Sequence, residues 1–175
     1  KRLSTFHPER PMPKIFRLVK NGKLIEGVYE GETLNTPSMF CVADALDSLM
    51  WIKEIGGLTE TIRRSNENFK CLQGWVDKTP WIENLVSDPR NRSNTSVCLK
   101  FSDERLISLI PDEKTRFVKE FVALLEAENA AFDIKGHRNA PPGLRIWCGA
   151  TINLDDIQKL LPWLEYSFHE IISSY

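Results

Sequence analysis

Hydrophobic residues recur at helical spacing along much of this 175-residue chain, and two such runs follow one another in its first half. The first begins after Pro37 and ends at the pair Gly56-Gly57, because glycine favours the end of a helix. It predicts a helix that is buried or interfacial. The second run has Ser65 within its apolar face, where a small residue lets two helices approach closely. That face comprises Leu58, Ile62, Phe69, Leu72 and Val76.

The second predicted helix also marks a division of the chain. Its opposite face is charged and is expected to face solvent; it comprises Glu60, Arg63, Arg64, Glu67 and Lys70. The helical pattern ends at Lys78-Thr79-Pro80, and proline is common just beyond the end of a helix. We therefore predict two portions, residues 1–78 and residues 79–175.

Shorter patterns predict strands before and after these helices. Asn21-Gly22 divides an apolar-rich stretch over residues 16–29, and Asn-Gly supplies the two positive-φ residues of a type I′ hairpin turn. Residues 97–101 alternate between apolar and polar, as in a strand that is buried on one side. Residues 130–134 and 144–148 are predicted to be short strands.

Two further helices complete a predicted α+β fold. Pro111 opens the first, with acidic residues following at the positive end of the helix dipole. Its inner face comprises Phe117, Val118, Phe121, Val122 and Leu125. Asn153 and Asp156 are spaced as in a capping box at the start of the last helix, which Pro162 is expected to bend. The residues that this helix is expected to bury are Ile157, Leu160, Leu161, Leu164, Phe168 and Ile171.

Composition narrows the function classes. With 23 basic and 24 acidic side chains the formal net charge is −1, so nucleic acid and anionic membranes are not expected partners. No apolar run approaches the roughly 20 residues that span a bilayer, and no signal peptide is recognisable. A cytoplasmic protein with reduced, buried cysteines and no metal site is expected. The cysteines are Cys41, Cys71, Cys98 and Cys148. The tryptophans are interpreted as core and interface anchors: Trp51, Trp75, Trp81, Trp147 and Trp163.

The candidate chemistry lies in residues 135–149, which read Lys-Gly-His-Arg-Asn-Ala-Pro-Pro-Gly-Leu-Arg-Ile-Trp-Cys-Gly. His137 and Arg138 set an imidazole beside a guanidinium, which suits a phosphate, and the guanidinium of Arg145 on a following strand suits a carboxylate. Two anion-binding groups indicate a small, doubly anionic substrate. Taken alone, two arginines around a Pro-Pro-Gly turn are more often solvated surface residues.

A second candidate site precedes the first predicted helix. Asn35 and Thr36 stand directly before Pro37, and proline is favoured at the first helical position. The free N–H groups of a helix N-terminus, with an amide and a hydroxyl beside them, make a site for a phosphate. Plain N-capping is the more frequent role of such residues.

Several segments occur here together in one order and spacing: Asn-Thr-Pro-Ser before a helix, Asn91-Arg92-Ser93 before a strand, Gly-His-Arg followed by Gly-Leu-Arg, and the closing run of residues 153–168. On these segments nearly the whole chain resembles the C-terminal half of the phosphoserine aminotransferase family. The resemblance implies a fold-type I enzyme that depends on pyridoxal phosphate. Residues 1–78 would end the large cofactor-binding domain, including the helix between the domains, and residues 79–175 would form the small α+β domain.

The resemblance also implies roles for individual residues. His137 and Arg138 would hold the substrate phosphate, and Arg145 would hold the α-carboxylate. Asn35 and Thr36 would bind the cofactor phosphate in the active site of the neighbouring subunit of a homodimer. The chain departs from the commoner family pattern by one additional residue between Arg138 and Arg145, which lengthens this loop.

The implied reaction belongs to serine biosynthesis and moves an amino group from glutamate to 3-phosphohydroxypyruvate, giving phosphoserine and 2-oxoglutarate. The lysine that forms the Schiff base with the cofactor is expected upstream of Lys1. The chain is therefore interpreted as a C-terminal fragment that is inactive by itself. The residues leave two alternatives open: a non-catalytic anion-binding or dimerisation module, and an aminotransferase of the same fold with a different substrate.

Overall fold

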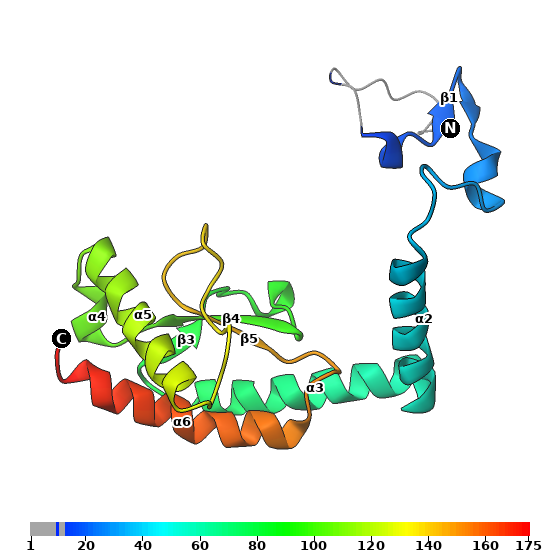
Figure 1. Cartoon of the computed structure of the whole chain (residues 1–175). Helices are drawn as coiled ribbons and strands as arrows, with labels where there is room; N and C mark the ends of the chain where they lie inside the picture. The colour runs from blue at the N-terminus through cyan, green and yellow to red at the C-terminus, as the bar shows by residue number, and fades with distance from the viewer. Residues whose placement is uncertain (1–9, 11–12) are drawn as a thin grey trace. The chain divides into compact units, whose positions relative to one another are not determined.

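The computed structural model describes residue 10 and residues 13–175, which divide into two compact units (Figure 1). The N-terminal unit spans Lys1–Trp51 and the C-terminal unit spans Ile52–Tyr175. The helix α3, Gly57–Val76, packs within the C-terminal unit against α6, Leu154–Ile172. The predicted boundary between residues 78 and 79 concerns the large and small domains of the aminotransferase family, and it stays a prediction.

The N-terminal unit contains the predicted hairpin. Strand β1, Val19–Lys20, pairs antiparallel with β2, Lys23–Leu24, between two 3₁₀ helices, η1 (Lys14–Phe16) and η2 (Glu26–Tyr29). Asn21 and Gly22 both have positive φ, of 53° and 74°. This is the backbone of a type I′ turn, so the Asn-Gly prediction is confirmed.

Helix α2, Met39–Glu54, begins later than predicted. The backbone N–H of Cys41 donates to Ser38 Oγ at 3.4 Å, and that of Val42 donates to the Ser38 carbonyl at 3.1 Å. Ser38 therefore caps the helix, and the predicted start with Thr36 before a proline in the first turn is wrong. The helix was predicted to be buried or interfacial; it has no buried residue within this chain, and the interfacial alternative stays a prediction. Its most exposed apolar residues are Met39, Phe40, Val42, Leu46, Leu49 and Met50.

The C-terminal unit is built on a three-stranded antiparallel sheet in the order β3-β4-β5, comprising β3 (Ile82–Asn84), β4 (Ser96–Phe101) and β5 (Leu144–Trp147). The paired residues Val97 and Ile146 are buried, as are Leu99 and its partner Leu144. Because side chains alternate along a strand, Arg145 lies on the opposite face of β5. The mixed helix-and-sheet architecture confirms the predicted α+β class.

Helices α3, α5 (Pro111–Ala127) and α6 join the sheet in a single hydrophobic cluster, and α3 and α6 run side by side (Figure 1). The shorter elements are η3 (Pro89–Asn91) and α4 (Glu104–Ile107). All of the predicted inner-face residues of α5 are buried. In α6 the prediction holds for most positions, but Leu161 and Ile171 are only half-buried and Ile172 is buried instead.

Aromatic rings fill much of this core. Trp81 stacks on Phe168 with ring centroids 4.1 Å apart, and Glu165 accepts the indole N–H groups of Trp75 at 2.8 Å and Trp81 at 3.2 Å. The prediction of core tryptophans is confirmed for these two. Trp147 is half exposed and is not a core residue, and a role for it at an interface stays a prediction.

Two predicted local structures differ in the C-terminal unit. Residues 130–134 form no strand, because Asp133 has φ of 53°, and only an isolated bridge joins Lys135 to Leu144. Asn153 makes no side-chain cap to α6. Its Oδ1 instead accepts a hydrogen bond from Arg64 Nη2 at 2.8 Å, so Arg64 does not simply face solvent as predicted.

The cysteines are free thiols, in agreement with the prediction that they are reduced. Burial, with a smaller contribution from Cys71, raises the pKa of the Cys148 thiol to about 12. Cys41 is exposed, so the expectation that all four are buried is wrong. No helix among the described residues is long and apolar enough to cross a membrane.

A buried amide joins α3 to the turn between β5 and α6. The side chain of Asn68 is 1% exposed, and its Nδ2 donates to the carbonyl of Ile152 at 2.9 Å and to those of Cys148 and Gly149 at 3.4 Å. Arg64 Nε donates to the Ala150 carbonyl at 2.8 Å. The two side chains thereby supply donors to carbonyls of this turn, of which that of Gly149 also accepts the backbone N–H of Ile152 at 3.0 Å.

We predict that Asn68→Ala lowers the free energy of unfolding by about 1–3 kcal/mol, because it removes a buried side-chain donor from carbonyls of this turn. Urea denaturation monitored by circular dichroism measures this change. Asn66→Ala is the matched control, since Asn66 is exposed on the same helix and accepts one bond from Asn94. Equal losses in the two variants would contradict the role assigned to Asn68.

Candidate anion-binding site

The loop that carries His137 and Arg138 is closed at its base by backbone hydrogen bonds. The N–H of Gly136 donates to the Gly143 carbonyl at 2.9 Å, and the N–H of Arg145 donates to the Ile134 carbonyl at 2.7 Å. A Cβ atom at Gly143 would collide with the Leu99 carbonyl of β4, so only glycine lets the loop approach the sheet this closely. The sequence thereby fixes where the loop ends and β5 begins.

His137 and Arg138 line one cavity of about 190 Å³ between this loop and α5. Lys135 also lines it, and none of the lining residues is acidic. Within the part of the chain that the structure describes, the side chains of Lys135, His137 and Arg138 form no ion pair with a carboxylate. A small cavity with cationic walls and no neutralising acid favours an anion.

The His137 ring is held by the next turn of the loop. Its Nδ1 accepts the backbone N–H of Asn139 at 3.2 Å, while its carbonyl accepts the N–H of Ala140 at 2.8 Å. Because Nδ1 supplies a lone pair to this bond, the proton of the neutral imidazole lies on Nε2. His137 can therefore donate from Nε2 to an anion while its backbone stays fixed.

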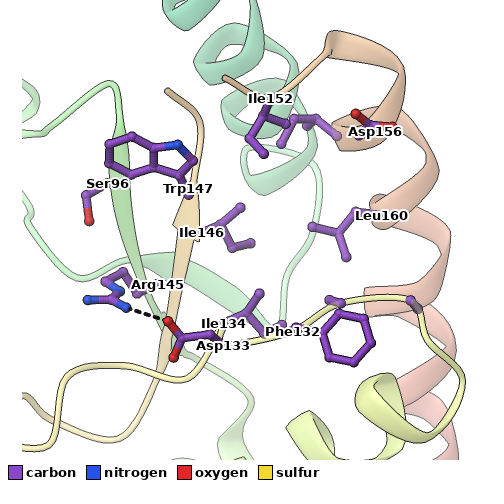
Figure 2. Close-up of a pocket in the computed structure, with 13 residues that line it drawn as sticks. Ser96, Phe132, Asp133, Ile134, Arg145, Ile146, Trp147, Ile152, Asp156 and Leu160 are labelled. Carbon is purple, nitrogen blue, oxygen red and sulfur yellow. Dashed lines mark hydrogen bonds and ion pairs between the residues drawn. The ribbon is translucent and has the colours of Figure 1, made fainter. Parts of the chain in front are cut away.

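Arg145 lines a different, larger cavity of about 500 Å³ along the outer edge of β5 (Figure 2). Its side chain is 39% exposed, and Nη2 lies 3.3 Å from Oδ2 of Asp133. The remaining wall is mostly apolar and comprises residues such as Ile134, Ile146, Trp147, Ile152 and Leu160. The structure thus brings His137 and Arg138 together but places Arg145 at a separate opening.

Asn35 and Thr36 belong to the N-terminal unit, between η2 and α2, and both are exposed. An amide, a hydroxyl and the N-terminus of a 16-residue helix lie within a few residues of sequence here. This donor set fits a phosphate. The role of these residues toward a cofactor stays a prediction.

Sequence reasoning missed Lys135 and Asp133. Lys135 had a usable signal, because it stands two residues before His137 and is cationic. Asp133 had none, since its contact with Arg145 depends on the positive φ that turns it toward β5. No group of three or more His, Cys, Asp and Glu side chains placed to hold a metal ion is found within residues 13–175.

Comparison with known sequences identifies the family. The chain is 44% identical to phosphoserine aminotransferase of Methanosarcina mazei over 169 residues, and 44% identical to that of Methanosarcina barkeri over 170 residues. These alignments cover 95% and 96% of the chain and fall in the C-terminal portion of each relative. The chain belongs to the phosphoserine aminotransferase family. It spans 42% and 43% of the lengths of these relatives. A scan against family models found no match.

Solved structures of phosphoserine aminotransferases share the fold. That from Bacillus circulans subsp. alkalophilus matches with a TM-score of 0.66 at 22% identity, covering 82% of this chain and 36% of that one. The pyridoxal-phosphate-bound enzyme from Trichomonas vaginalis matches with a TM-score of 0.64 at 22% identity, covering 79% and 36%. The predicted fold, the C-terminal part of a fold-type I aminotransferase, is confirmed.

We predict that neutral His137 carries its proton on Nε2, because the Asn139 N–H binds Nδ1. Long-range ¹H–¹⁵N NMR of the imidazole nitrogens measures the tautomer directly. Asn139→Ala should leave the spectrum of His137 unchanged, since the backbone donor remains. The exposed His169 on α6 provides an internal reference, and an Nδ1-protonated His137 would overturn the assignment.

Proposed function

We propose that this chain supplies the substrate-recognition residues of a phosphoserine transaminase, which converts 3-phosphohydroxypyruvate and glutamate to phosphoserine and 2-oxoglutarate. The observation that carries the proposal is the cationic cavity of Lys135, His137 and Arg138, accompanied by a separate guanidinium at Arg145. Similarity to relatives named phosphoserine aminotransferase over 95% of the chain supports it.

In the proposed complex the two ends of one substrate are held separately. His137 Nε2 and the Arg138 guanidinium donate to the phosphate, or to the side-chain carboxylate of glutamate. Arg145 holds the α-carboxylate that every amino acid substrate carries. These residues bind and orient, which places the reacting carbon without taking part in the proton transfers.

We assign the cofactor phosphate to Asn35, Thr36 and the N-terminus of α2, because their amide, hydroxyl and backbone N–H groups fit a phosphate. When bound, pyridoxal phosphate supplies the electron sink of transamination. We assign the lysine that joins the cofactor to the part of the relatives that this chain does not cover, since the chain spans 42% of the length of the Methanosarcina mazei protein, and we therefore expect the 175 residues alone to be inactive. A cytoplasmic location is part of the proposal and is supported by the free cysteines.

A homodimer is the second part of the proposal. Asn35 and Thr36 would serve the cofactor of the neighbouring subunit, as the family resemblance implies. The exposed apolar residues of α2, which directly follow, support an interface there, since a run of exposed Met, Phe and Leu is unfavourable in water.

We predict that the full-length enzyme is a dimer and that Phe40→Lys weakens it, because the substitution places a charge on the proposed interface. Phe40 is 78% exposed in this chain. Sedimentation velocity over a range of protein concentrations measures the dimer dissociation constant. Ile107→Lys on α4 is the control, because Ile107 is also exposed, at 58%, but lies on another element. A fully active monomer would refute the dimer proposal.

We predict that Arg138→Ala in the full-length enzyme costs about 2–4 kcal/mol of transition-state binding for phosphoserine, a fall of roughly 30- to 900-fold in kcat/KM. The loss should be smaller for glutamate, which has no phosphate. Arg116→Ala is the matched control, because Arg116 lies on α5 and binds Tyr175 rather than lining the cavity. Equal losses for the two substrates would favour an aminotransferase of different specificity.

A further inference from the structure

The ion pair between Arg145 and Asp133 places a carboxylate on the guanidinium that we assign to the substrate carboxylate (Figure 2). The pair is made through one nitrogen–oxygen contact of 3.3 Å. Asp133 is 89% exposed at its side chain, whereas a substrate carboxylate could offer Arg145 both of its oxygens. The internal carboxylate is therefore weakly held and of the same chemistry as the ligand.

The backbone at Asp133 indicates that this contact is not a by-product of regular structure. Asp133 is one of three non-glycine residues with positive φ among those described, with Asn21 and Asn129. Asn21 lies in the hairpin turn and Asn129 follows the C-cap residue of α5, both common places for this conformation. Asp133 instead lies beside the edge of β5, next to buried Ile134. Such strained residues cluster at ligand-binding sites.

Stability alone gives a weak reason for the pair. Ion pairs between side chains this exposed contribute little to folding, while the positive φ of a non-glycine residue carries a cost. The exchange of one carboxylate for another at Arg145 offers a functional reason, because the guanidinium keeps a partner whether or not substrate is present.

We propose that Asp133 is an internal competitor for the α-carboxylate site: it occupies Arg145 in the absence of substrate and is displaced when the substrate carboxylate binds. This inference rests on the proposed role of Arg145. Its consequence is that Asp133 lowers the affinity for every substrate that carries an α-carboxylate, and by the same factor, since the displaced contact is the same each time.

Asp133→Asn tests the competition in the full-length enzyme. Asparagine tolerates the positive φ and keeps the shape of the side chain, so it removes the charge with little effect on the backbone. We expect the KM values for phosphoserine and glutamate to fall together by about 1.5- to 5-fold, the scale of an exposed ion pair, with kcat unchanged. The dissociation constant for 2-oxoglutarate, measured by titration calorimetry, should fall by a similar factor.

Asp156→Asn is the matched control. Asp156 lines the same cavity and carries the same charge, but its carboxylate accepts from Asn153 rather than from Arg145. An equal fall in both variants would show a general charge effect and overturn the competition. Unchanged or raised KM values in Asp133→Asn would also overturn it, the latter by showing that Asp133 positions Arg145 for binding.

Arg145→Ala separates this inference from the function on which it rests. If Arg145→Ala lowered kcat/KM for all amino acid substrates and Asp133→Asn did not lower KM, the competition would be contradicted. The transaminase proposal would be unaffected. Unchanged kinetics in Arg145→Ala would contradict the assignment of Arg145 to the α-carboxylate, and with it the role of Asp133 as a competitor.

Discussion

The buried amide of Asn68 is the interaction on which the site geometry depends. The turn that it binds, residues 148–153, joins the strand that carries Arg145 to the helix that forms the opposite wall of the larger cavity. A turn has no ladder of its own to satisfy its carbonyls. One side chain of α3 therefore sets the spacing between β5 and α6, and Arg64 adds a second hydrogen bond from the same helix.

Local sequence patterns predicted the structure correctly for elements whose conformation or buried face follows from neighbouring residues alone. The inner face of α5 follows from its apolar spacing, and the hairpin follows from Asn21-Gly22, whose positive φ angles are a local property of those two residues. His137 and Arg138 were chosen from sequence as candidate anion-binding residues; they line one cavity without an acidic residue, and their role stays a prediction.

Contacts between residues far apart in the sequence could not be predicted from such local patterns. Asn153 has the spacing of a capping residue, yet its side-chain oxygen Oδ1 accepts a hydrogen bond from Arg64, which is 89 residues away in sequence. Residues 130–134 were predicted to form a short strand. The positive φ of Asp133 turns the backbone instead, and only an isolated bridge at Lys135 joins this segment to β5. The apolar pattern of α2 predicted a buried or interfacial helix, and within this chain its apolar residues are exposed.

A backbone hydrogen bond between Gly136 and Gly143 closes the loop just before β5, so the length of the loop can change without changing the register of β5. The two glycines fix the entry and exit points, so an added residue changes only the six positions between them and leaves the pairing of β5 with β4 intact. Loop-closure entropy changes slowly with length, so one more residue costs little. Under the proposed function, a residue added to this loop changes the segment that carries His137 and Arg138 without moving Arg145 on β5, so the residues assigned to the phosphate and the residue assigned to the carboxylate can change independently.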